Sequence, residues 1–505
     1  MLGSVLDGSV TAASAEVGRA RELPPLSPLD RDVLVSLDRR SRPFAFVPAL
    51  CRTYSLRDDE FNSEWVGPDG FSIVDIGEFP TIAADLRGEM HRLGPAKLRR
   101  RHSPGIAVII SQQCNLTCGY CLAKQGTFGL NVANMKKAEV TTRIESLFEA
   151  NPDIDFIKFF GGEPTLRIDL IKGICDFVEN KLKKRVHFAL TTNGTLAASR
   201  HLDLWQRYHV SVSVTVDGPP HVHDAVRTRA DGRGSHASAV AYCRDLAAAN
   251  FPFAVVGVFD ERHLRSGMSY LDMIKYLNEI APLSKVQFLE SLGDAASHEM
   301  GEEPLQMARA QVVEAVDAIM EAMTSAFISP NDGRWLYDNN IFRFIYGIVR
   351  ETALPYEHAC TASNLTTIFP SGELMACYTF AEKSTSAYGS KWTSKTELED
   401  RRQEFRAAHK WEAMAARGTR VPWYRGVVGD ICVADMLNSS GGLEQSAFYK
   451  AFQETATLRI LQWMPVVAKD PVAVARVLHA MEQHKIITGE YTLKMSRDFT
   501  AAQGA

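Results

Sequence analysis

Residues 106–121 read IAVIISQQCNLTCGYC, a short run of apolar and β-branched residues followed by three cysteines within eight positions. The run IAVIIS is typical of a strand that is buried on both faces of a sheet. Cys114, Cys118 and Cys121 follow with the spacing CxxxCxxC, on a loop at the carboxyl end of the strand. Active sites of parallel α/β folds assemble at that end. This stretch therefore predicts an α/β fold and the position of its functional site.

The same pattern of strand and helix recurs along the chain. Strand candidates occupy residues 106–111, 155–160, 186–191, 210–216, 253–259 and 285–289, and amphipathic stretches such as 135–150 and 168–182 lie between them. Strands that alternate with helices form a parallel sheet with right-handed crossovers. Six such units are too few for a closed eight-stranded barrel, so we predict a partial (βα)6 TIM-like barrel.

Composition divides the rest of the chain into further parts. Residues 1–28 are predicted to be a weakly ordered lead-in, and residues 29–103 a small N-terminal α+β module. The partial barrel is assigned to residues 104–330. Residues 331–440 contain glycine, serine, cysteine and a predicted strand pair around Ser371-Gly372, and residues 441–505 form a helical C-terminal tail.

The overall composition is that of a soluble globular protein, with 46% hydrophobic and 23% charged residues. The net charge of −4 recruits neither nucleic acid nor an anionic membrane. The sequence contains no apolar run of membrane-spanning length and no signal peptide, so we predict a cytoplasmic protein. In a reducing compartment, clustered cysteines are metal ligands or catalytic groups more often than disulfides.

The cysteine loop has three interpretations. A zinc site needs a fourth Cys or His, and none follows within about twenty residues. Cysteines that serve only packing are not expected to crowd onto one loop. Three thiolates suit a [4Fe-4S] cluster that keeps one iron open for a substrate or cofactor, and this is the prediction we adopt.

With Tyr120 before the third cysteine, the loop resembles that of the radical S-adenosylmethionine (radical SAM) superfamily. The resemblance covers residues 104–300. It implies that S-adenosylmethionine binds the open iron and that one electron, from a donor such as flavodoxin or ferredoxin, cleaves it. The resulting 5'-deoxyadenosyl radical abstracts hydrogen from an unactivated carbon.

Three further motifs support this resemblance. Gly161-Gly162-Glu163-Pro164 matches the family's GGEP, residues 191–194 resemble its TNG, and DGPPHVHDAVR at 217–227 matches one large branch. By resemblance, Glu163 accepts from the methionyl ammonium, and Arg227 makes a charge-assisted contact with the carboxylate. The alternatives are an ordinary loop turn for GGEP and a surface arginine. The implied cofactor-binding residues are Tyr120, Gly161, Gly162, Glu163, Pro164, Thr192, Asn193, Ser213 (near the ribose or methionyl group), Asp217 and Arg227.

Three further residues of this domain have predicted positions or roles. Glu290 follows the sixth strand and is the candidate catalytic residue, with a solvated carboxylate as the alternative. Cys175 and Cys243 lie on amphipathic helices and are expected in the core.

A second cysteine set consists of Cys360, Cys377 and Cys432. The hairpin that leads to Cys377 resembles the opening of the SPASM or twitch extension, which carries auxiliary iron–sulfur clusters behind many peptide-modifying radical enzymes. That extension normally continues with many more cysteines. The count here allows at most one auxiliary cluster, with Asp435 or His358 as a possible fourth ligand or an open iron. The alternative is a degenerate extension that has lost its cluster.

The resemblance implies a maturase that acts on a peptide or protein side chain. CLAKQGTFG at 121–129 looks most like enzymes that install thioether or carbon–carbon cross-links in ribosomally made peptides. The segment 29–103 would then bind a leader peptide by β-augmentation. The alternatives are formylglycine formation as in anaerobic sulfatase maturases, a small-molecule twitch-type dehydrogenase, and a non-catalytic iron–sulfur electron-transfer protein.

Overall fold

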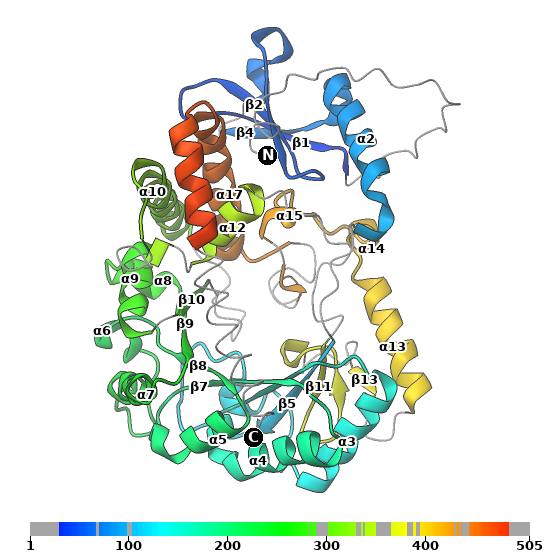
Figure 1. Ribbon diagram of the computed structural model, residues 1–505, viewed down its shortest axis with the longest axis vertical. Helices are drawn as coiled ribbons and strands as arrows, with labels where there is room; N and C mark the ends of the chain where they lie inside the picture. The colour runs from blue at the N-terminus through cyan, green and yellow to red at the C-terminus, as the bar shows by residue number, and fades with distance from the viewer. Residues whose placement is uncertain are drawn as a thin grey trace.

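Two sheets organise the protein (Figure 1). The computed structural model describes residues 30–66, 70–97, 104–281, 283–288, 301–329, 335–336, 339–349, 365–380, 387–389, 394–428, 431–433, 436 and 444–483. Within these ranges, a four-stranded sheet lies near the N-terminus and a nine-stranded sheet forms the main body.

The N-terminal sheet is antiparallel, with strand order β3-β2-β1-β4. Its elements are β1 (Asp32–Leu37), β2 (Pro43–Val47), β3 (Arg52–Ser55), β4 (Phe71–Asp75) and the following helix α2 (Pro80–Lys97). One face packs a small apolar core that includes Val33, Ala45 and Leu86. The other face joins the main core, where the Phe46 ring meets Trp423 at 6.3 Å between centroids. The central strands β1 and β2 are therefore buried on both faces.

Six parallel strands run through the main sheet in chain order, as predicted. They are β5 (Gly105–Ser111), β6 (Phe156–Gly161), β7 (His187–Thr192), β8 (Ser211–Thr215), β9 (Phe253–Phe259) and β10 (Leu283–Phe288). Each one overlaps a strand that the apolar runs of the sequence predict. The fold is therefore α/β with a parallel sheet.

Helices cover the convex side of this sheet (Figure 1). They are α3 (Lys137–Ala150), α4 (Ile168–Asp176), α5 (Leu202–Arg207), α6 (Pro220–His223), α7 (His236–Ala248), α8 (Glu261–Arg265) and α9 (Tyr270–Ile280). Residues of the outer face of the strands, such as Phe159 and Val212, are buried against them. Residues of the other face, such as Lys158 and Ser211, are half-buried. We call this second face the inner face.

The predicted strand pair around Ser371-Gly372 is present and extends the main sheet. β11 (Leu365–Ile368) pairs parallel with β5 and antiparallel with β12 (Leu374–Met375), which pairs with β13 (Ala387–Gly389). Gly372, with φ of +86°, closes the turn between β11 and β12. The sequence did not predict the pairing of β11 with β5, which adds the hairpin that leads to Cys377 to the edge of the parallel set.

The helices that follow close the main core. They are α10 (Glu302–Ser325), α12 (Asn340–Val349), α13 (Lys395–Ala408), α14 (Trp411–Ala416), α15 (Arg425–Val428) and α17 (Ala447–Ala468), and residues 471–483 are also helical. Asp317 of α10 accepts from Arg459 of α17 at 2.8 and 2.7 Å and from Trp463 Nε1 at 2.8 Å. The helix α17 is therefore packed against α10 of the main body. No described helix combines the length and apolar character that crossing a membrane requires.

Candidate active site

The loop after β5 holds three half-buried cysteines with free thiols. The backbone N–H of Leu116 donates to Cys114 Sγ at 3.4 Å, and the N–H of Gln125 donates to Cys121 Sγ at 3.2 Å. The N–H of Cys121 donates to the carbonyl of Cys118 at 3.2 Å. Backbone donors aimed at sulfur stabilise a thiolate, as second-shell contacts do around a metal centre.

The charges around these sulfurs indicate what the loop can bind. Burial raises the pKa of the Cys114 thiol to about 11, and the nearby charges of Glu163, Cys118 and Cys121 act in the same direction. Neighbouring thiolates repel one another, so a cation among them stabilises the charged form. In the described part of the chain, no three His, Cys, Asp or Glu side chains converge on one metal ion. An iron–sulfur cluster binds each thiolate through a different iron, so the donor set fits a cluster better than a single zinc ion.

Two glycines bring the loop after β6 against the cysteine loop. A Cβ atom on Gly161 would lie 2.3 Å from the carbonyl oxygen of Ser111, and one on Gly162 would lie 2.2 Å from that of Gln113. The N–H groups of Gly162 and Glu163 donate to the same two carbonyls, at 2.8 and 2.9 Å. Only glycine permits this contact between the two backbones.

Glu163 connects the loop after β6 to the loop after β7. Its Oε1 accepts from the N–H and hydroxyl of Thr165, at 3.0 and 2.6 Å, and from the hydroxyl of Thr192 at 2.7 Å. Its Oε2 accepts from the N–H of Asn193 at 2.8 Å. Burial raises the pKa of Glu163, and these donors oppose the rise. Oε2 has a single donor among the described residues, which leaves it able to accept one more.

Asn193 links the same loop to the first cysteine. Its Nδ2 lies 3.8 Å from Cys114 Sγ and donates to Asn115 Oδ1 at 2.9 Å. Asn115 in turn donates to the hydroxyl of Thr195 at 2.7 Å. The sequence did not single out Asn115 or Thr195, because an asparagine between cysteines and a threonine after a turn carry no distinctive spacing.

Tyr120, Asp217 and Arg227 form a buried network beside the cysteine loop. The hydroxyl of Tyr120 donates to Asp217 Oδ2, and Arg227 Nη1 donates to that hydroxyl at 2.6 Å. Burial raises the pKa of Tyr120 well above its usual value, so the hydroxyl keeps its proton. Burial also raises the pKa of Cys118, and the charge of Arg227 opposes that rise. Arg227 thus holds Tyr120 and places positive charge near Cys118.

Two residues that the sequence did not single out complete this network. The guanidinium of Arg262 lies 4.6 Å from the centre of the Tyr120 ring. The imidazole of His263 lies with Nε2 at 3.0 Å from the carbonyl oxygen of Asp217. Asp260 and His263 form the capping box of α8, and the D-x-x-H spacing is the signal that could have located them.

The family model "Radical SAM superfamily" matches residues 108–262, which contain the cysteine loop and the loops after the next strands. This chain carries a radical SAM domain. Its sequence is 25% identical over 137 residues to the radical SAM cyclopropyl synthase TigE of Paramaledivibacter caminithermalis, covering 23% of this chain and 28% of TigE. It is 30% identical over 155 residues to GTP 3',8-cyclase of Mycobacterium marinum, covering 30% of this chain and 41% of that enzyme. Both matches span less than half of the relative's length.

The radical SAM domain and the regions around it also resemble solved structures. Native anSMEcpe with bound AdoMet superimposes with a TM-score of 0.56 at 16% identity, covering 72% of this chain and 99% of that chain. Its complex with AdoMet and the Cp18Cys peptide gives a TM-score of 0.53 at 17% identity, over 72% and 100% of the two chains. At this identity the likeness concerns the fold.

The remaining predicted site residues lie at several places. Pro164 begins a short turn after Glu163, and Ser213 is half-buried on the inner face of β8. Cys175 and Cys243 are fully buried in the core, as predicted. Glu290, Cys360, His358 and Asp435 lie outside the described residues.

Cys377 and Cys432 of the second set both approach Tyr378. Burial raises the pKa of Tyr378, and the charges of Cys377 and Cys432 contribute to the rise. The Tyr378 ring stacks on Phe160, with ring centroids 4.3 Å apart. Phe128 of the cysteine loop lies 6.2 Å from the Tyr378 ring, so aromatic rings connect the first cysteine set to the second.

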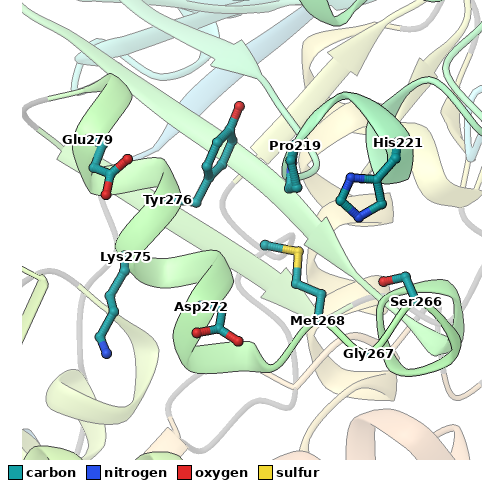
Figure 2. Close-up of a pocket in the computed structure, with 9 residues that line it drawn as sticks. All are labelled: Pro219, His221, Ser266, Gly267, Met268, Asp272, Lys275, Tyr276 and Glu279. Atoms are coloured by element: carbon teal, nitrogen blue, oxygen red, sulfur yellow. The ribbon is translucent and has the colours of Figure 1, made fainter.

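A hollow of about 510 Å³ lies elsewhere, between the start of α6 and α9. Figure 2 shows Pro219 and His221 on one side of it and Asp272 and Tyr276 of α9 on the other, with Met268 between them. It is lined by none of the cysteines or other predicted cofactor-binding residues, so we do not assign the active site there.

His223 makes the stability of the radical SAM domain depend on pH. Burial and then the charge of Arg227 lower the pKa of His223 from 6.5 to about 4. As the pH falls from 6.5 toward 4, His223 therefore becomes protonated in the unfolded state but stays neutral in the folded state. We expect this group to reduce the free energy of unfolding by roughly 2 kcal/mol between pH 7 and 5.

Urea unfolding at pH 5, 6 and 7 measures this effect. The variant His223→Asn should lose less stability over that range than the wild type, and His221→Asn, which alters an exposed histidine, should behave like the wild type. An equal pH dependence in all three proteins would contradict the assignment.

Proposed function

We propose that the protein is a radical SAM maturase that modifies a side chain of a ribosomally made peptide, most specifically by installing a thioether or carbon–carbon cross-link. The observation that carries the radical SAM part is the junction of three loops at the carboxyl ends of β5, β6 and β7. There Glu163 and Asn193 connect the GGEP loop to Cys114 through the hydrogen bonds described above.

In this proposal, Cys114, Cys118 and Cys121 hold the [4Fe-4S] cluster. The free acceptor position of Glu163 Oε2 receives the ammonium of S-adenosylmethionine, and Ser213 faces the same side of the sheet. When bound, the cluster and S-adenosylmethionine supply a 5'-deoxyadenosyl radical that abstracts hydrogen from the substrate. The protein excludes water and fixes the positions of the two partners. An electron donor such as flavodoxin or ferredoxin would supply the electron.

Two features support a peptide as the substrate. The hairpin β11–β12 leads to Cys377, and the charges of both Cys377 and Cys432 act on Tyr378, which supports an auxiliary centre of the SPASM or twitch kind. The N-terminal sheet ends in β3 and β4, each of which pairs with one neighbour in the described sheet. An extended leader peptide would add to such an edge strand by β-augmentation.

The experiment that tests the proposal uses anaerobic, reduced enzyme with S-adenosylmethionine. Release of 5'-deoxyadenosine is expected, and its absence with every candidate substrate would overturn the radical SAM assignment. The peptide encoded by a short reading frame beside the gene is then added as substrate, and the mass of the product is measured by mass spectrometry. A loss of two mass units without a new aldehyde favours a cross-link, whereas formylglycine made from serine loses the same mass but carries an aldehyde that hydrazine reagents trap. Turnover of a small molecule alone would contradict the peptide assignment.

The second cysteine set allows a separate prediction. Cys377→Ala should lower the iron content of the reconstituted enzyme by about one cluster, because its thiolate is one of at most three cysteine ligands. Release of 5'-deoxyadenosine without peptide should persist. Cys243→Ala, which alters a buried core cysteine, serves as the control. An unchanged iron content in Cys377→Ala would contradict the auxiliary cluster.

A further inference from the structure

Lys158 lies in the middle of the inner face of the main sheet, and nothing above assigns it a role. It is on β6, two residues before Phe160, and its side chain is half-buried. In the register of the sheet, Lys158 pairs with Ala107 of β5 on one side and with Ala189 of β7 on the other. Both neighbours are alanines, so the side chains next to Lys158 are too short to cover it.

The ammonium of Lys158 contacts aromatic rings. Its Nζ lies 5.1 Å from the centre of the Phe160 ring and 5.9 Å from that of Tyr378. Burial lowers the pKa of Lys158, and the charge of Cys377 opposes this. Among the described residues, no carboxylate forms an ion pair with Lys158 and no acceptor hydrogen-bonds its Nζ. Cation–π contacts compensate only part of the hydration that a half-buried ammonium loses.

Two hydroxyl side chains lie on the same inner face, on the next two strands. Ser211 shares the row of Ala189 and Lys158, and Thr191 lies one row closer to the carboxyl ends of the strands. Both side chains are half-buried. Within the described chain, their hydroxyls form no hydrogen bond with another residue. A cation and two free donors thus face the same side of the sheet, and such groups bind a carboxylate.

We infer that Lys158, with the hydroxyls of Thr191 and Ser211, binds a carboxylate of the substrate peptide. The inference rests on the proposed function and deepens it, because it specifies a carboxylate as the group of the peptide that the enzyme recognises. The carboxylate belongs to an Asp or Glu side chain near the modified residue, or to the C-terminus of the peptide. Lys158 lies on β6 between the GGEP loop and Tyr378. A carboxylate bound there would therefore hold the peptide between the two cysteine sets.

A binding measurement tests this without turnover. Reconstituted enzyme with S-adenosylmethionine is mixed with a pool of synthetic peptides that have randomised flanks around a central Glu, Gln, Asp or Asn and either a free or an amidated C-terminus. Ultrafiltration separates retained peptides, which mass spectrometry counts. We expect the wild type to retain one acidic class at least about 10-fold better than its amide twin, as a charge-assisted hydrogen bond predicts. The pair of peptides that shows the preference (Glu against Gln, Asp against Asn, or a free against an amidated C-terminus) identifies the source of the carboxylate.

Variants assign the preference to Lys158. The ratio should fall to about 1 in Lys158→Met and in Lys158→Gln, and should persist in Lys158→Arg, which keeps the charge. Lys158→Gln retains a polar end and serves if the methionine variant does not fold. Lys172→Met removes a charge from the exposed side of α4 and should leave the ratio unchanged.

Three results would overturn the inference. They are a wild-type enzyme with no preference for acids, a neutral variant that keeps the preference, and a neutral variant that alters only the reduction potential of the Cys377-dependent centre. The last result would assign the charge of Lys158 to the second cysteine set. If the proposed function itself were wrong, the result would be different, because the wild-type enzyme would release no 5'-deoxyadenosine.

Discussion

Cys118→Ala is expected to abolish cleavage of S-adenosylmethionine. Three thiolates hold the proposed cluster, and the side chain removed is the one beside Arg227 in the buried network with Tyr120. Two remaining thiolates leave two irons without a protein ligand, so the cluster is not retained. The expected result is a loss of about four irons per chain together with all release of 5'-deoxyadenosine.

Cys175→Ala provides the matched control for this variant. It removes a thiol that is fully buried on α4, far from any proposed ligand role, and should keep the iron and the cleavage activity. Iron analysis and chromatography of the nucleoside product measure both quantities. A Cys118→Ala enzyme that keeps its iron and releases 5'-deoxyadenosine would contradict the cluster assignment.

Glu163→Gln is expected to weaken the binding of S-adenosylmethionine by about 100-fold. The carboxylate of Glu163 accepts from four donors, on Thr165, Thr192 and Asn193. A glutamine amide in its place turns an NH2 group toward at least one of these donors, and it removes the charge that would pair with the methionyl ammonium. Both effects act on the same loop junction.

Equilibrium dialysis of labelled S-adenosylmethionine measures this change. Glu149→Gln alters an exposed carboxylate at the end of α3 and should bind as tightly as the wild type. Iron content should remain near the wild-type value in Glu163→Gln, because no thiolate is removed. Unchanged affinity would show that the Glu163 carboxylate serves only to join the two loops.

Local sequence pattern predicted the main sheet well. The six strands have apolar or alternating runs bounded by polar turns, and such runs form parallel strands because helices bury one face of each. It predicted the hairpin around Gly372 for the same reason. Pattern did not single out β1 and β3, which are short, and β1 is buried on both faces only because the N-terminal sheet docks on the main body.

Some residues of the candidate site can be found from local sequence pattern, and others cannot. The spacing of the cysteines and the order GGEP, TNG and DGP along the chain singled out Cys114, Glu163, Asn193 and Asp217 as candidates. Pattern did not identify Arg262 or His263, because each acquires its role from a partner far away in the chain, at Tyr120 and Asp217.

The sequence by itself determined the α/β class, the six parallel strands and the position of the cysteine loop, because these follow from local spacing and short-range periodicity. Only the tertiary structure decided which side chains meet. Strand register set Lys158 between two alanines, and the pairing of β11 with β5 brought Tyr378 onto Phe160. Register and strand order are long-range choices that depend on the fit of whole faces, so the charge on the inner face became visible only in the folded chain.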